Sequence, residues 1–160
     1  QLLEAARWAP SWANTQAWEF IIVRDRQVME KIAATYAPNN PATKCTQAAS
    51  VLIVGCARTG VSGAHDGKNL TIFSEWFLFD LALAVQNICL RAHELGLGTV
   101  IVSLLDHRAL KKVLSVPEGY EAVTVIPVGR PAVPDRQGPP RKNVADFSHL
   151  NGFGEKYVRS

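Results

Sequence analysis

Residues 7–20, with the sequence RWAPSWANTQAWEF, bring together side chains that could bind a flat organic group. Ser11, Asn14 and Gln16 supply hydrogen-bond donors and acceptors in a tryptophan-rich segment. Amides at that spacing could recognise a heterocycle whose edge alternates donors and acceptors. In the commoner arrangement, Ser11 and Asn14 bond nearby backbone in a turn while the tryptophans fill the core. Those tryptophans are Trp8, Trp12 and Trp18. The residue types alone favour this second arrangement.

A second candidate lies near the C-terminus, where Arg141 and Lys142 follow the sequence GPP. The prolines would stiffen the chain and hold the two cations at a defined point. A guanidinium fork beside a point charge suits a phosphate group. A solvated basic tail is the commoner explanation of two adjacent charges, and both interpretations stay open on the residues alone.

The usual catalytic motifs are missing from the sequence. It contains no Gly-x-Ser-x-Gly elbow, Walker loop, Gly-x-Gly-x-x-Gly turn or His-Glu-x-x-His pair. Its four histidines are scattered, and its three cysteines form no metal-ligand pattern and indicate free thiols in a reducing compartment. These residues are His65, His93, His107 and His149, with Cys45, Cys56 and Cys89. We therefore expect no metal site, and for each histidine a solvated or packing role is commoner than proton transfer.

The bulk properties describe an ordinary globular chain. Its 160 residues suit a single domain over 1–160, and a net charge of +3 is too small to predict nucleic-acid binding. The free thiols predict a cytoplasmic protein. Membrane insertion is not expected, because no run of about 18 uncharged apolar residues occurs. Gln1 is not an initiator methionine and LLEAARWA resembles the later turns of a helix, so we expect that residues precede it.

Short β-branched runs bounded by turn residues predict four strands, at 19–25, 50–58, 98–103 and 121–128. Pro127 lacks an amide proton and should lie at a strand end or edge. Helical patterns separate the strands, two of them capped by Asp25 and Asp106. This order predicts a mixed α/β or α+β layered domain.

The longest predicted helix covers residues 75–95, with Ser74 as its cap and Gly96 as its end. Its first half is apolar on nearly every side, so it must be buried on every side. Periodicity leaves open whether it is a central core helix or is shared with a second subunit. Residues 59–76, which precede it, form a long segment with glycines and aromatic residues, typical of a functional loop.

Four segments together resemble the FMN-dependent nitroreductase family. EAARWAPSWANTQAWEFIIVRD resembles the family's opening helix, its Ala-Pro-Ser-x-x-Asn-x-Gln-Pro-Trp loop and its first strand, although Ala17 replaces the proline. DLALAVQNICLRAHELGLGTVIVSLLD resembles the central helix, the Gly-Leu-Gly turn and the strand beside the flavin. VLSVPEGYEAVTVIPVGRPA and PPRKNVADF resemble the last strand and the basic tail. The family's N-terminal Arg-Arg-Ser motif is not in this sequence.

The resemblance implies an α+β nitroreductase-like fold with a central mixed sheet flanked by helices. It also implies a homodimer, with the long helix at its interface and two FMN sites. Pro10, Ser11, Trp12 and Asn14 would contact the flavin from one subunit, with Gln16 bracing their loop. Backbone near Ser103 and Leu104 would approach flavin N5. Arg141 and Lys142 would hold the phosphate.

The implied activity is an NAD(P)H-dependent flavin oxidoreductase that reduces a nitroaromatic, a quinone or a similar small oxidant. Phe73 and Trp76 are expected to line the substrate pocket. The same fold leaves two alternatives open. One is a flavin-dependent dehalogenase or enoyl-type reductase, and the other is a flavin-binding dimer without turnover.

Overall fold

The centre of the protein is an antiparallel sheet of four strands in the order β1-β2-β6-β5. The computed structural model describes residues 1–133 and 137–157. The strands of this sheet are β1 (Trp18–Val23), β2 (Val51–Arg58), β5 (Gly98–Thr99) and β6 (Tyr120–Gly129). The helices are α1 (Leu2–Arg7), α2 (Arg26–Ala33), α3 (Thr43–Ala48), α4 (Phe77–Glu94), α5 (His107–Val113) and α6 (Val144–Phe147). A short hairpin of β3 (Ala64–His65) and β4 (Lys68–Asn69) precedes α4.

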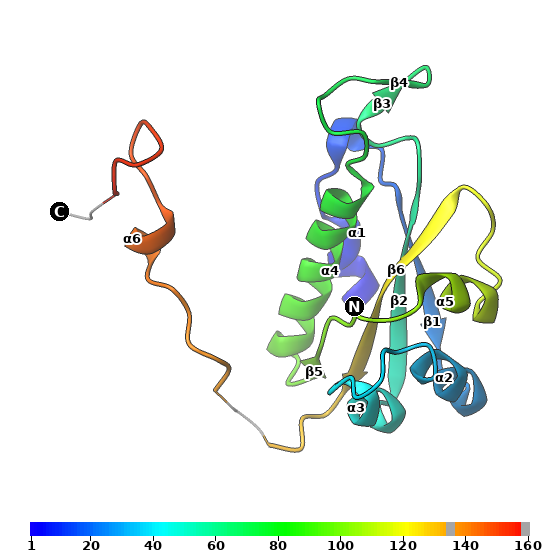
Figure 1. The fold of residues 1–160 in the computed structure, drawn as a ribbon. Coiled ribbons are helices and arrows are strands. Elements are labelled where there is room, and N and C mark those ends of the chain that lie inside the picture. The colour runs from blue at the N-terminus through cyan, green and yellow to red at the C-terminus, as the bar shows by residue number, and fades with distance from the viewer. Residues whose placement is uncertain (134–136, 158–160) are drawn as a thin grey trace.

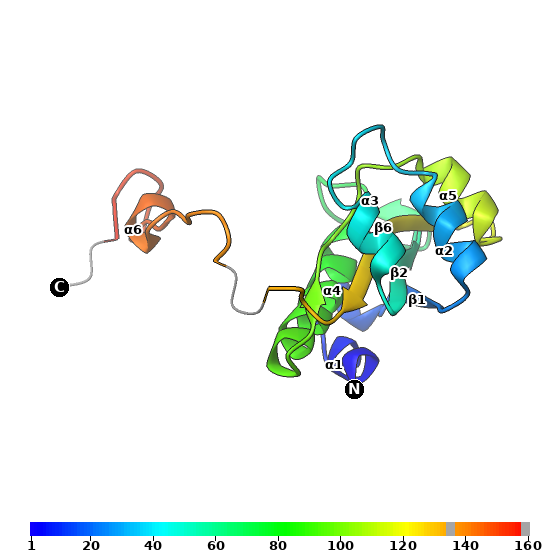
Figure 2. The same cartoon turned by 90° about the horizontal axis from the view of Figure 1, so that it is seen from below.

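Helices cover both faces of the sheet (Figures 1 and 2). Successive side chains of a strand point to opposite faces, so each apolar strand contributes to two cores. Ile53 and Ile126 pack with α1 and α4, whereas Leu52 and Val125 pack with α2 and α5. Strands covered on both sides are continuously apolar, which explains why the β-branched runs were visible in the sequence. The predicted α+β class is confirmed.

The sheet differs from its prediction in two details. A mixed sheet was expected, but every pair of neighbouring strands among the described residues is antiparallel. The strand predicted at 98–103 is also interrupted: β5 ends at Thr99, and only an isolated bridge between Val102 and Val125 follows. Helices flank the sheet as expected. The differences from the prediction are the antiparallel direction of strand pairing and the early end of β5.

Pro127 explains part of the interruption in β5. The amide and carbonyl of Val125 bond those of Val102, so this residue faces the β5 edge. Two residues further on, Pro127 faces the same edge and has no amide proton to donate. Pro127 lies near the end of β6, as predicted. The strand itself is not an edge strand, because β6 pairs with β2 on one side and β5 on the other.

The long helix α4 packs one face against the sheet and leaves the other exposed. Its buried residues include Leu81, Val85 and Ile88, while Leu78, Phe79 and Leu90 are exposed in the single chain. The predicted cap at Ser74 is wrong, because the helix begins at Phe77 after Trp76 and has no side-chain cap. Its predicted end is confirmed, since Gly96 follows with a left-handed φ of 70°.

The two ends of the chain differ in how they attach to the sheet. Helix α1 packs along α4, whereas α6 lies apart from the rest of the protein in both views of the ribbon (Figures 1 and 2). Of the helices in the described ranges, none has the length and apolar character needed to span a bilayer.

Candidate functional site

The 10–16 loop, between α1 and β1, has an unusual backbone. Ala13, Asn14 and Gln16 have φ values of 45°, 55° and 47°, in the left-handed region that residues with a Cβ seldom adopt. A single-turn helix at Trp12–Asn14 forms its centre. Such strain persists only where the surroundings hold it, and it concentrates at functional sites. The loop is thus a strong candidate for a binding element.

Hydrogen bonds inside the loop hold its turn closed. The Gln16 amide donates to Ser11 Oγ at 2.9 Å, and the Asn14 amide donates to the Ser11 carbonyl at 3.1 Å. The predicted turn bonding is therefore correct for the Ser11 hydroxyl. Asn14 is exposed, and its side-chain amide bonds no other described residue. Gln16 braces the loop through its backbone.

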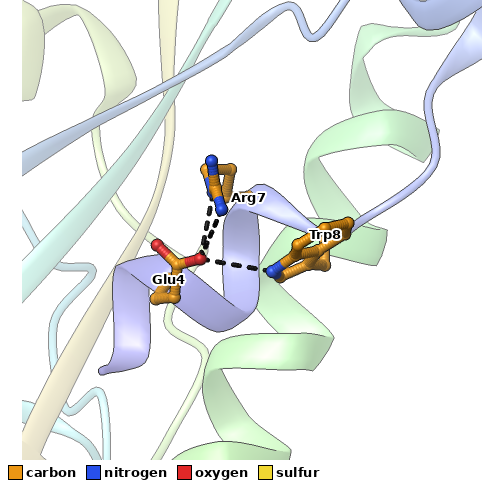
Figure 3. A network of polar contacts seen from close by, with 3 residues as sticks. All are labelled: Glu4, Arg7 and Trp8. Carbon is orange, nitrogen blue, oxygen red and sulfur yellow. Dashed lines mark hydrogen bonds and ion pairs between the residues drawn. The ribbon is translucent and has the colours of Figure 1, made fainter.

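Of the tryptophans around the loop, Trp18 packs against the core, as the turn interpretation expects, whereas Trp8 and Trp12 do not, which corrects that interpretation for these two. Trp8 is 74% exposed at the end of α1. Its Nε1 donates to Glu4 Oε1 at 3.2 Å, and the Arg7 guanidinium, also bonded to Glu4, lies 5.1 Å from its ring centre (Figure 3). Trp12 and Trp18 are half-buried. The three rings frame the loop without being enclosed.

Asp80, on the first turn of α4, anchors the 10–16 loop through hydrogen bonds. Its side chain is fully buried. Oδ1 accepts from the Trp12 amide at 2.9 Å, and Oδ2 accepts from Ser62 Oγ at 2.6 Å and from Thr15 Oγ1 at 3.4 Å. The sequence reading missed this residue, although an acid within the apolar first half of the long helix was a visible signal. Charged groups are rarely buried unless they are paired or hydrogen-bonded.

A pocket of about 230 Å³ opens beside the loop. It is lined by Pro10, Ser11, Trp12, Trp76, Phe79, Asp80 and Leu83. Trp76 makes edge contacts with Phe79 at 5.5 Å and with Phe73 at 5.8 Å between ring centres. Of the two predicted substrate-pocket residues, Trp76 lines this pocket and Phe73 touches it only through Trp76. The lining residues that sequence reasoning missed are Phe79, Asp80 and Leu83.

Ser103 and Leu104 lie at the opposite edge of the sheet, after β5. The Leu104 carbonyl accepts from Asn40 Nδ2 at 2.9 Å and from the Ala37 amide at 3.2 Å, and the Ser103 carbonyl accepts from the Leu105 amide. Within residues 1–133 and 137–157, neither the Ser103 amide nor the Leu104 amide donates to another residue. Both residues are exposed, so two backbone donors are free for a ligand.

Arg141 and Lys142 lie on the tail, apart from both groups. Both side chains are exposed, and Arg141 donates to the nearby Pro139 carbonyl at 3.4 Å. The segment that carries them runs away from the sheet towards α6 in Figures 1 and 2. One chain by itself therefore does not bring the predicted residues together.

A larger pocket, of about 870 Å³, lies elsewhere. It runs between α3 and the ends of β5 and β6, and Lys44, Thr99, Gly129 and Arg130 are among its lining residues. None of the predicted site residues lines it. Among the described residues there is also no group of three His, Cys, Asp or Glu side chains that could hold a metal ion.

Comparisons with known proteins agree on one family. The model of the Nitroreductase family matches residues 1–130. A protein of Methanothermobacter thermautotrophicus named "Putative NADH dehydrogenase/NAD(P)H nitroreductase" is 32% identical over 136 residues, which cover 82% of this chain and 64% of that protein. A protein of the same name from Archaeoglobus fulgidus is 31% identical over 140 residues and is covered over 71% of its length.

A solved structure gives the same result for the fold. The crystal structure of a protein with that name from Bacteroides thetaiotaomicron matches with a TM-score of 0.76 and 27% identity. The match covers 95% of this chain and 82% of that one. The chain thus spans less than two thirds of the first curated relative and about four fifths of this solved structure.

Proposed function

Because the chain belongs to the nitroreductase family, we propose that it is an FMN-dependent oxidoreductase working as a homodimer. In this proposal residues 1–160 form one flavin-binding domain. The bound flavin would accept hydride from NAD(P)H at N5 and pass it to a small oxidant, such as a nitroaromatic or a quinone. The three free cysteines favour the reducing cytoplasm as the compartment.

The observation that carries the proposal is the strained 10–16 loop, which the interior of the protein holds firmly and which exposes Asn14 and Pro10. A rigid loop with an unpaired amide suits the edge of a flat ring, because both donor and acceptor atoms are available at fixed positions. Pro10, Ser11, Trp12 and Asn14 would contact the flavin, and Gln16 would keep the loop in shape.

Two further groups fit the same cofactor. The free amides of Ser103 and Leu104 would face flavin N5, where a backbone donor stabilises negative charge without titrating. Arg141 and Lys142 would hold the phosphate through a fork and a point charge. The protein would then bind the flavin, orient it towards the substrate and shield it from solvent, because the hydride transfer itself is the chemistry of the cofactor. No side chain is needed as acid or base.

The distance between these groups supports a site built from two chains. Val102 pairs with Val125, which lies level with Val54 and Ile21, so Ser103 is three strand spacings from β1. Three spacings are about 14 Å, and the loop lies beyond Trp18, roughly 10 Å further along the strands. One flavin ring cannot contact both groups of the same chain. In a dimer, each ring would lie between the loop of one chain and the amides of its partner.

The exposed face of α4 suits the same dimer. Leu78, Phe79 and Leu90 are each more than half exposed in the single chain. Exposed apolar residues that gather on one helix face mark an interaction surface. A second copy packed against this face would bury these residues and complete the burial that the helix's composition predicts.

The first test is the visible absorption spectrum of the purified full chain, with the released cofactor identified after heating. We expect a flavin spectrum with about one FMN per chain. NADH and NADPH oxidation is then followed with and without an added quinone or nitroaromatic. Oxidation that depends on the added oxidant supports the proposed activity.

Other outcomes separate the alternatives. Flavin reduction by NAD(P)H without turnover of quinones or nitroaromatics would favour a dehalogenase or an enoyl-type reductase. Bound flavin that neither nicotinamide reduces would favour a dimer that only binds flavin. A colourless protein that takes up no added FMN would contradict the proposal.

A further inference from the structure

We propose that Asp80 is a positioning residue, which holds the 10–16 loop in the shape that the cofactor requires. The inference rests on the proposed flavin site and extends it to a residue that would act through the backbone of the loop. Asp80 is the one acidic residue of α4 whose side chain is fully buried. Burying a carboxylate is costly unless strong hydrogen bonds compensate. Its partners therefore show what this carboxylate does.

Those partners come from the two segments that surround the pocket. Trp12 and Thr15 belong to the 10–16 loop, while Ser62 belongs to the 59–76 segment. The 2.9 Å bond fixes the backbone of Trp12, the residue directly before the left-handed pair Ala13 and Asn14. The 2.6 Å bond to Ser62, itself fully buried, fixes the second segment to the same carboxylate. The Asp80 side chain thus holds the 10–16 loop and the 59–76 segment in a fixed position relative to each other.

The strain in the loop is the reason that such an anchor is needed. Three residues with a Cβ adopt left-handed φ values within four positions. Without external contacts, this stretch would relax towards ordinary backbone angles. Ser11 closes the turn from inside, but the only buried anchor from another element among the described side chains is Asp80. Removing the carboxylate should therefore release the loop while leaving its own residues intact.

An ordinary structural role predicts something different. Acidic residues in the first turn of a helix stabilise it through the helix dipole, and Asp80 occupies that turn. Its carboxylate oxygens, however, bond to the loop and to Ser62. If Asp80 only stabilised the helix, any substitution elsewhere that lowered the stability of the protein equally would have the same effect on the loop.

The test compares Asp80→Ala and Asp80→Asn with Asp25→Ala in the full chain. Asp25 also accepts two backbone amides, those of Gln27 and Val28, but it caps α2 on the other face of the sheet. Two quantities are measured: the FMN dissociation constant by flavin fluorescence, and hydrogen exchange of the amides in residues 11–16 of the FMN-free protein. The second readout does not require a functioning flavin site.

We expect Asp80→Ala to weaken FMN binding on the order of tenfold to a hundredfold, and to speed exchange at Trp12 and its neighbours. Asp80→Asn should give a smaller change, because its oxygen can accept from the Trp12 amide and its NH₂ can donate to the hydroxyls. Asp25→Ala should lower the melting temperature and leave both readouts at wild-type values. If Asp80→Ala does not fold, Asp80→Asn and Ser62→Ala carry the test.

The two proposals fail in different ways. Wild-type protein that does not bind FMN contradicts the proposed function, and loop exchange in the Asp80 variants still decides the positioning role. Wild-type FMN affinity together with unchanged exchange in Asp80→Asn and Ser62→Ala would overturn the positioning role alone. Equal effects of Asp25→Ala on the loop would overturn it as well, because they would assign the change to stability.

Discussion

Individual polar side chains fix the backbone around residues 102–104. Thr124 Oγ1 donates to the Val102 carbonyl at 2.9 Å, and Asn40 Nδ2 donates to the Leu104 carbonyl at the same distance. These bonds occupy the carbonyls of a segment whose β5 pairing has ended. With its carbonyls held inside, the segment keeps the amides of Ser103 and Leu104 free. The Thr124 and Asn40 side chains thus shape the backbone that, in the proposed site, would face flavin N5.

Cys56 provides a pH-dependent test at this scale. The pKa of its thiol is raised from 9.0 to about 11, chiefly by burial, with Glu19 adding to the rise and Lys111 opposing it. The unfolded chain ionises first, so the contribution to stability is complete below pH 9 and is lost as the pH rises towards 11. The loss should reach about 2 to 3 kcal/mol. Denaturant unfolding from pH 8 to 11 measures it.

Two variants isolate the thiol in that experiment. Cys56→Ala should show a shallower alkaline decline in the free energy of unfolding than wild type. Cys45→Ala, which removes an exposed thiol, should follow the wild-type curve. Identical slopes in wild type and Cys56→Ala would mean that other groups cause the decline.

At the scale of elements, the 59–76 segment is organised by Trp76. The Trp76 amide donates to the Ser62 carbonyl at 3.1 Å, and Nε1 donates to Thr71 Oγ1 at 2.9 Å. A side chain at Gly63, which has a φ of 87°, would collide with the Trp76 ring. The aromatic group of Phe73, Trp76 and Phe79 therefore has a defined place beside the 10–16 loop.

Replacing Phe73 and Trp76 with alanine should change which oxidant the enzyme prefers. The Trp76 ring lines the pocket and the Phe73 ring packs against it. A changed apolar wall alters relative kcat/KM values by about tenfold. Steady-state kinetics with several quinones and nitroaromatics measure this ratio, and FMN content should stay the same. Ile72→Ala is the matched control, since Ile72 is 94% exposed on the same segment. If Phe73→Ala and Trp76→Ala both kept the wild-type ratios of kcat/KM between oxidants, the assignment of these residues to the substrate pocket would be wrong.

Elements were predictable where the local sequence alone decides them. The strands at 50–58 and 121–128 are apolar on both faces, and they form as β2 and β6. The start of α4 was not predictable, because Trp76 is fixed by the Ser62 carbonyl near the other end of the 59–76 segment. The break after Thr99 depends on Pro127 in another strand. Local patterns thus predicted the four strands of the main sheet and the long helix, but not α3, α6 or the β3–β4 hairpin, and contacts between elements set the ends.

At the scale of the whole molecule, the candidate site is divided. The 10–16 loop and Ser103 lie at opposite edges of the sheet, and the tail with Arg141 and Lys142 extends away from both (Figure 1). The family motifs gave these residues, but no spacing along the chain says that they meet. Asp80 was missed for a related reason, since its role depends on partners 18 and 68 positions away.

Subunit mixing tests this division directly. Asn14→Ala and the double variant Arg141→Ala/Lys142→Ala should each lose most of their FMN affinity as homodimers, because each loses one half of both sites. A mixed dimer would keep the loop of one chain and the tail of the other, so one of its two sites is intact. Unfolding and refolding a 1:1 mixture makes about half of the dimers mixed. FMN binding should then recover to about a quarter of the wild-type number of sites, measured by fluorescence titration. If both halves of a site came from one chain, mixing would restore nothing.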